Sequence, residues 1–172
     1  MRSLGLRLAS EHGTTIIETT IASAILMIGM IGLASMSGLA IMYTENHGHL
    51  EARTTEYAQD KMEHLLALAY NDAVSDTTFF PAHPSGGTGL AIGGGTNTAT
   101  PVNGYVDWLR YNGDMLGGGT TPPDDWFYQR VWQVSSPSTG IKQITVVTTA
   151  RAAIAREMIP KSTVVMLKSG NF

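Results

Sequence analysis

The feature that most constrains this chain is an uncharged run from Thr19 to Thr44, headed by a single carboxylate at Glu18. The run is 26 residues long, and about 20 apolar residues already cross the hydrocarbon core of a bilayer as an α-helix. An acidic residue at the centre of a membrane helix costs roughly 2.5 to 3.5 kcal/mol, and less near an end. Because a residue kept at that cost usually has a partner, we expect Glu18 to have one.

Residues 1–13 precede the run and carry two basic residues, Arg2 and Arg7. They contain neither the apolar core nor the small-residue cleavage site of a secretory signal peptide. The basic residues predict a cytoplasmic N-terminus, since the Lys/Arg bias of short flanking loops sets the orientation of a membrane helix. Everything after Thr44 is then expected on the other side of the membrane.

The apolar run allows more than one interpretation. It could be a plain single-pass membrane anchor. Gly29, Gly32 and Gly38 could weaken the helix locally, because Gly costs about 1 kcal/mol relative to Ala inside a helix. Ala34 and Gly38 have the spacing of a small-xxx-small packing pair, which many membrane helices contain without a partner.

The residues Gly13, Thr14 and Glu18 resemble the processing and assembly residues of the type IV prepilin family. In that family a short basic leader ends in Gly, a prepilin peptidase cuts after it, the new N-terminus is methylated, and Glu is the fifth mature residue. The resemblance implies cleavage after Gly13, methylation at Thr14, and pairing of Glu18 with the N-terminal amine of a neighbouring subunit. The chain departs from the family at Thr14, where Phe is usual, and at Ser35, where many major pilins have Pro.

After Thr44 the sequence becomes that of an amphipathic helix, because apolar residues recur at spacings of three, four and seven with charged residues between them. We expect one helix over residues 14–70, with its first half in lipid or a filament core and its second half on a globular head. Gly48 is its weakest point. The adjacent His47 and His49 point in different directions on a helix, which disfavours a metal site. The apolar positions are Leu50, Tyr57, Ala58, Met62, Leu65, Leu66 and Ala69; the charged ones are Glu51, Arg53, Glu56, Asp60, Lys61 and Glu63.

The C-terminal part of the chain has the composition of β-strands, rich in aromatic and β-branched residues. A turn is expected over residues 135–140, while residues 150–159 could be a short helix or an irregular connection. Tyr128 and Trp132 are expected in the core or in cross-strand pairs, rather than as a carbohydrate-binding platform. The overall prediction is an α+β fold, in which a long N-terminal helix, transmembrane and then amphipathic, packs on a C-terminal antiparallel β-sheet head as in pilins. The expected strands are 126–134, 141–149 and 162–168.

Residues 71–125 have a loop composition, with three glycine-rich runs and five prolines. Only residues 105–111 alternate well enough to predict a strand, and the rest is expected to be a variable surface region. No glycine run is followed by Lys-Ser or Lys-Thr, so the sequence contains no phosphate-binding loop. The chain has no Cys, so we expect the head to be held by packing and sheet pairing without disulfides.

No motif in the sequence indicates catalysis or a cofactor. There is no Cys nucleophile, no His-Glu-x-x-His motif and no nucleophile elbow, so we do not expect an enzyme. Asp114, Asp124 and Asp125 lack the ligand spacing of a calcium loop and are expected to be solvated turn residues. The net charge of −3 argues against wrapping of nucleic acid, which requires clustered Lys and Arg.

A second resemblance narrows the family. The pattern Tyr128-x-Arg130-x-Trp132-x-Val134, together with residues 140–146, resembles the PilV-type minor pilins. So do the helix segment 58–63 and the apolar strand ending at Lys168-Ser169. The implied organisation is a leader peptide at 1–13, a transmembrane or filament-core helix at 14–44, an amphipathic helix at 45–70, a Gly/Pro-rich region at 71–125 and a β-sheet at 126–172.

This resemblance implies a minor pilin subunit of a type IV pilus, with roles in pilus assembly, twitching motility and adhesion. The implied partners are other major and minor pilins, the prepilin peptidase, the inner-membrane assembly platform and membrane lipid. The implied location is the bacterial inner membrane, crossed once with the head in the periplasm, and then the pilus at the cell surface. A pseudopilin of a type II secretion system and, from another class, a membrane-anchored extracytoplasmic binding protein are the alternatives.

Overall fold

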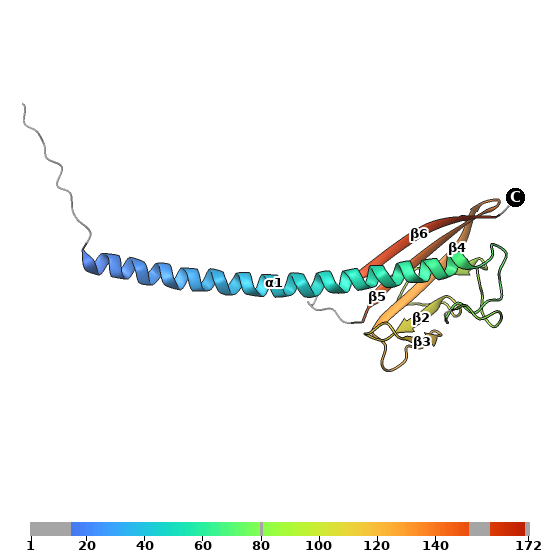
Figure 1. The fold of residues 1–172 in the computed structure, drawn as a ribbon, viewed down its shortest axis with the longest axis horizontal. Helices are drawn as coiled ribbons and strands as arrows, with labels where there is room; N and C mark the ends of the chain where they lie inside the picture. Colours follow the sequence, from blue (N-terminus) through green and yellow to red (C-terminus); the bar gives the residue numbers. More distant parts are fainter. Residues whose placement is uncertain (1–14, 80, 152–158, 171–172) are drawn as a thin grey trace, which may run out of the picture. The chain divides into compact units, whose positions relative to one another are not determined.

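The computed structural model describes residues 15–79, 81–151 and 159–170, without the side chains of residues 46 and 47. The chain divides after Met42 into two compact units. Both contain part of one α-helix, α1 (Ile16–Ala67), which continues as α-helix through Gly48 (Figure 1). The second unit, from Tyr43 onward, is the head.

The helix predicted over residues 14–70 is confirmed with shorter bounds, since Thr14 lies outside the described residues and α1 ends at Ala67. The last turn tightens, with the Leu68 amide donating to the Leu65 carbonyl at 3.3 Å. Within this turn, Lys168 Nζ donates to the Leu66 carbonyl. A lysine that satisfies a free carbonyl and opposes the negative end of the helix dipole favours termination here.

The head contains a six-stranded antiparallel sheet in the order β3-β2-β4-β5-β6, with β1 paired to β4 beside this path. The helical part of the head packs on this sheet, which confirms the predicted α+β fold. β6 forms one edge of the sheet and β3 the opposite one (Figure 1). The two-residue β1 also lies on the β3 side, where it pairs only with β4. The strands are β1 (Gly93–Gly94), β2 (Val106–Leu109), β3 (Met115–Gly118), β4 (Tyr128–Ser138), β5 (Ile141–Ala150) and β6 (Lys161–Ser169).

The connection between β4 and β5 is shorter than the turn predicted over residues 135–140. β4 continues to Ser138, and only Thr139 and Gly140 make the turn. The register shifts between Ser135 and Ser138, and such a bulge accommodates the intervening Pro137, which has no amide hydrogen for the ladder. Residues 152–158, within the segment left open between helix and irregular connection, lie outside the described residues.

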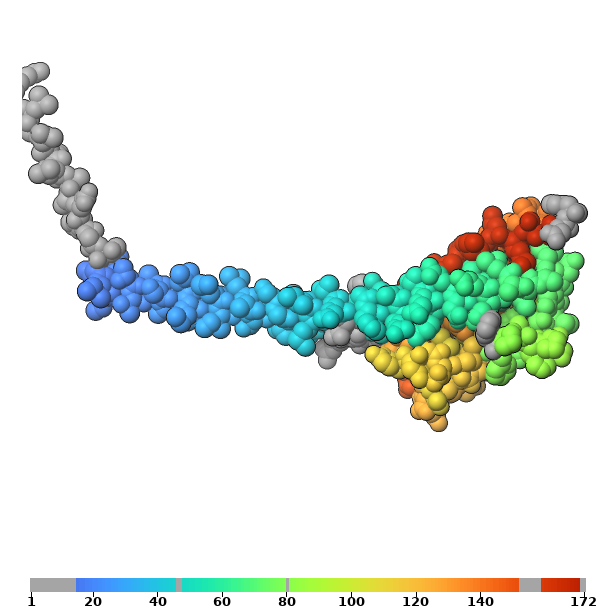
Figure 2. Space-filling view, viewed as in Figure 1, coloured from blue at the N-terminus to red at the C-terminus, as the bar shows by residue number. Residues whose placement is uncertain are grey.

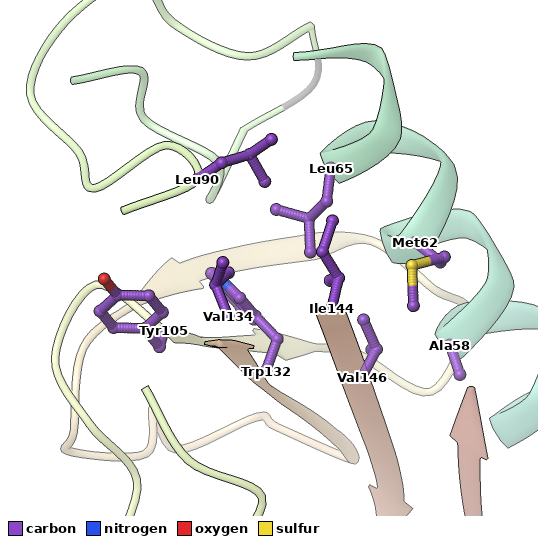
Figure 3. Packing of buried hydrophobic residues seen from close by; sticks show 9 residues of the cluster. All are labelled: Ala58, Met62, Leu65, Leu90, Tyr105, Trp132, Val134, Ile144 and Val146. Carbon is purple, nitrogen blue, oxygen red and sulfur yellow. The ribbon is translucent and has the colours of Figure 1, made fainter. Parts of the chain in front are cut away.

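The main core lies between the helix and the sheet. Trp132 and Val134 of β4 and Ile144 and Val146 of β5 meet the apolar stripe of α1 (Figure 3). Trp132 is fully buried and Tyr128 is 1 % exposed, so their predicted role in packing is confirmed. The helix contributes Ala58, Met62 and Leu65.

Residues 71–125 contribute more to the fold than the predicted surface region. Besides β2, where a strand was predicted, they form β1 and β3 and supply the buried core residues Leu90 and Tyr105. Glycine permits this close packing: Gly94 has a positive φ of 78°, and a Cβ there would overlap the Trp132 carbonyl oxygen. The same glycines that give a loop composition therefore allow this segment to lie against β4.

Candidate functional site

The N-terminal part of α1 presents an exposed apolar surface. It contains a segment long and apolar enough to cross a membrane, and none of the residues in its most apolar 18-residue window is buried. Ile16 is 87 % exposed and Met36 is 72 % exposed. A continuous apolar surface of this length needs lipid or other apolar helices to cover it.

Polar side chains within this segment are satisfied by the helix itself. The hydroxyls of Thr20, Ser23 and Ser35 each donate to the carbonyl four residues earlier, at 2.8, 2.7 and 2.8 Å. Hydrocarbon offers no hydrogen-bond partners, so such internal pairing is what a membrane or filament core requires. A Cβ built at Gly29 or Gly38 meets no atom within 4 Å, which leaves this helix surface open to close packing.

Glu18 lies in the first turn of α1, three residues after Thr15. Thr15 caps the helix: its Oγ1 accepts from the Glu18 amide at 3.4 Å, and its carbonyl accepts from the Thr19 amide at 3.2 Å. Thr-x-x-Glu is the spacing of a capping box, and a carboxylate in the first turn also favours the positive end of the helix dipole. The helix cap at Thr15 was not predicted from the sequence, although the Thr-x-x-Glu spacing could have indicated it.

The Glu18 carboxylate forms no ion pair with another described residue. Among the residues that the structure describes, the nearest Lys or Arg along the chain is Arg53. No described residue therefore supplies a counter-ion for Glu18. Gly13 and Thr14, the predicted cleavage and methylation positions, lie outside them as well.

Three ionisable side chains are buried where the head segment of α1 meets the sheet. Asp107 of β2 accepts from Lys61 Nζ at 2.7 Å, from Arg130 Nε at 2.7 Å and from Arg130 Nη2 at 3.0 Å. The side chains of Lys61 and Asp107 are 0 % exposed, and that of Arg130 is 1 % exposed. Lys61 Nζ also donates to the Thr77 carbonyl and lies 4.0 Å from the centre of the Trp132 ring. This cluster ties α1, β2 and β4 together.

Asp60 completes the charge balance of the cluster at its solvent side. Its carboxylate accepts from Arg130 Nη1 at 2.8 Å and lies 3.3 Å from His64 Nε2. The Asp60 side chain is 48 % exposed. The cluster therefore contains two carboxylates, Asp60 and Asp107, and two cations, Lys61 and Arg130. Of the two carboxylates, only that of Asp107 is buried.

The buried geometry shifts the pKa values of these groups. Burial lowers the pKa of Lys61 to about 8, although the Asp107 carboxylate opposes this shift. Burial alone would raise the pKa of Asp107, but the adjacent Arg130 and Lys61 charges hold it below its usual value. Lys61 and Asp107 are therefore an ion pair at neutral pH.

Lys61 is buried, although the sequence analysis listed it among the charged residues that lie between the apolar positions of the amphipathic helix. Lys61 lies at spacings of three and four from Ala58 and Leu65, inside the apolar stripe, so the periodicity could have identified it. Arg130 lies two residues from both Tyr128 and Trp132 in β4, so the three buried side chains share one face of the strand. The sequence did not show that Asp107 lies between the two cations, because that contact joins distant segments.

The residues considered as metal ligands do not form a site in the described part of the chain. No group of three or more His, Asp or Glu side chains there could hold a metal ion. Asp114 accepts from Asn112 Nδ2 at 2.8 Å within its own turn, and Asp125 lies 3.8 Å from Arg110 Nη2 at the surface. His49 is exposed, while the side chain of His47 lies outside the described part.

The chain matches no protein-family model, no curated protein and no solved structure. The fold is a helix on an antiparallel sheet, and one helix among the described residues is able to span a membrane. The residues with a distinctive environment are Glu18, which has no described counter-ion, and the Lys61–Asp107–Arg130 cluster.

Proposed function

We propose that this protein is a minor pilin subunit of a type IV pilus, processed by prepilin peptidase and incorporated into the pilus or the complex that initiates it. The observation that carries the proposal is Glu18, a carboxylate with no described counter-ion at the head of an exposed apolar helix. The proposed location is the inner membrane, with the head in the periplasm, and afterwards the pilus, where the subunit contributes to assembly, motility and adhesion.

The chemistry of cleavage supplies the counter-ion that Glu18 lacks. Cutting after Gly13 would create an α-amine at Thr14, and such amines have a pKa of about 8, so most are charged at neutral pH. A positive charge at the start of its own helix is disfavoured by the helix dipole. Pairing that amine with Glu18 of a neighbouring subunit would neutralise both charges inside an apolar bundle. Removing one partner of a buried pair costs roughly 3 to 5 kcal/mol.

The capping geometry at Thr15 allows a sharp test, because it separates charge from local helix structure. Glu18→Gln keeps a side chain that can complete a capping box but removes the charge. Thr15→Ala removes the capping hydroxyl but keeps the charge. We expect Glu18→Gln and Glu18→Ala to insert into the membrane at wild-type levels and to lose at least about tenfold in the sheared filament fraction, consistent with a lost buried pair. Thr15→Ala should be incorporated almost normally.

The measurement is the ratio of this protein in sheared surface filaments to that in membranes, determined for each variant in the native host. Wild-type incorporation of Glu18→Gln would contradict the proposal and leave helix capping as the role of Glu18. A protein that stays wholly in the membrane fraction would instead favour an anchored binding protein. Mass spectrometry of the mature chain tests processing separately, with a methylated Thr14 as the expected N-terminus.

A further inference from the structure

β6 is an edge strand whose outer side is unpaired among the described residues. It pairs with β5 through nine consecutive residue pairs without a register shift, and no described strand lies on its other side. The Gly170 amide donates to the Gly140 carbonyl at 2.8 Å, so even-numbered residues exchange hydrogen bonds with β5. The amides and carbonyls of the odd-numbered residues Thr163, Val165 and Leu167 therefore point to the free edge.

The same odd-numbered residues expose apolar side chains beside that edge. The even-numbered side chains Ser162, Val164 and Lys168 contact α1 or the core. Side chains alternate along a strand, so Val165 and Leu167 lie on the opposite face, where they are 50 % and 63 % exposed. Part of β6 is visible at the surface of the head in red (Figure 2).

The two edges of the sheet differ in the features that normally prevent strands from joining. β3 has only four residues, ends in Gly117-Gly118, and pairs with β2 through an irregular register. β6 has nine residues, contains no proline or bulge, and carries no charge between Lys161 and Lys168. Proteins usually block an edge like that of β6 with charges, bulges or short strands, because it can act as a template for another strand.

We propose that the free edge of β6 pairs with β6 of a second copy of this chain. The pairing is antiparallel and centred on Val165, and it joins two heads through one continuous sheet. Among the described strands, β6 is the one long edge without such blocking features, so a contact between identical copies that uses this edge alone is β6 to β6, which is two-fold symmetric and closes at a dimer. The dimer is independent of Glu18 and of incorporation into a pilus.

The sequence of β6 is compatible with itself in this register. Val165 lies opposite Val165 of the partner, and Thr163 lies opposite Leu167 of the partner. Lys161 lies opposite Ser169 of the partner, so no lysine faces a lysine, and like charges directly opposite would destabilise the pair. The backbone groups that point to the free edge are those that an antiparallel partner would bond.

Because the natural chain has no Cys, single cysteines introduced into the full-length chain test this register directly in native membranes. In a hydrogen-bonded antiparallel pair the Cα atoms of opposite residues are about 5.5 Å apart, a distance at which a disulfide forms. Val165→Cys should therefore crosslink to itself under mild oxidation. Thr163→Cys alone should not, since the two copies of residue 163 are offset by four residues, about 13 Å. Mixing Thr163→Cys with Leu167→Cys chains should restore the crosslink.

The control for random collision is Val102→Cys, at a loop position that is 42 % exposed. We expect Val165→Cys to give at least fivefold more disulfide dimer than Val102→Cys. Adding Val165→Lys to the Thr163→Cys and Leu167→Cys pair should abolish the crosslink by placing two lysines opposite each other, while Val102→Lys should not. The proposal is overturned if Val165→Cys gives no more dimer than Val102→Cys, if Thr163→Cys alone crosslinks equally well, or if Val165→Cys crosslinks only to a different protein.

Discussion

Replacing Asp107 by Asn is expected to be the most damaging single change of charge in the head. Asp107 accepts three charge-assisted hydrogen bonds from Lys61 and Arg130, and all three side chains are at most 1 % exposed. Asn has one acceptor oxygen, and its amide group would repel the adjacent cations. Two buried positive charges would then share the single exposed carboxylate of Asp60.

The expected magnitude follows from this burial. Removing one partner of a buried ion pair costs roughly 3 to 5 kcal/mol, because a charge is left in a medium that cannot solvate it. Domains are stable by only about 5 to 15 kcal/mol, so the change removes a large fraction of the free energy of unfolding. With a urea dependence of about 2 kcal/mol per molar, the unfolding midpoint should fall by about 2 M.

The assay is urea unfolding of the full-length chain in detergent, followed by tryptophan fluorescence. All three tryptophans, Trp108, Trp126 and Trp132, lie in the head, so the signal reports head unfolding. Urea is preferred to guanidinium because it is uncharged and does not screen ion pairs.

Asp60→Asn is the matched control, since it removes the same charge from the same cluster at a position that is 48 % exposed. It should cost no more than about 1 kcal/mol, as partly solvated pairs do. A triple variant with Lys61→Met, Asp107→Leu and Arg130→Met should recover most of the loss, because apolar replacement of a whole buried network is often neutral. If Asp107→Asn shifts the midpoint no more than Asp60→Asn, burial does not determine the energetics of this cluster and the reasoning is refuted.

Two further predictions use the same unfolding assay. Lys61 has a folded pKa of about 8 and an unfolded value of 10.5, so between these values the unfolded state binds more protons and the Lys61 contribution to stability rises with pH. The free energy of unfolding of the wild type minus that of Lys61→Met should therefore rise with pH above pH 8, by at most about 1.4 kcal/mol per pH unit. A difference that stays flat or falls would contradict the lowered pKa of Lys61. Gly94→Ala should lower the free energy of unfolding by more than about 1 kcal/mol, because φ is +78° and the Cβ overlaps the Trp132 carbonyl. Gly38→Ala, where a Cβ meets nothing, should leave the urea midpoint unchanged, and equal effects of the two glycine changes would contradict the packing role of Gly94.

Local sequence was sufficient for the features that depend on neighbouring residues. An uncharged run longer than a bilayer predicted an exposed apolar helix, and the apolar spacing after Thr44 predicted the helix that packs on the head. Dense β-branched and aromatic residues predicted β4, β5 and β6. The isolation of Glu18 from other charged residues singled it out as a candidate functional residue. Its spacing of three residues from Thr15 already indicated a helix cap at Thr15. These signals are local because helix and strand periodicity, capping and transfer to lipid act over a few residues.

The meeting of distant residues could be seen only in the folded chain. Lys61 and Asp107 are 46 residues apart, and Arg130 is a further 23 residues along the chain, yet the three form one buried cluster. Glycine-rich segments with a loop composition bring Leu90 and Tyr105 into the core, because a missing Cβ permits a close approach whose partner the local sequence does not specify. The order of strands left β6 at an edge, and no property of its residues distinguishes an edge strand from a central one. Burial, charge pairing and strand neighbours are set by the whole folded chain, which is why they required the structure.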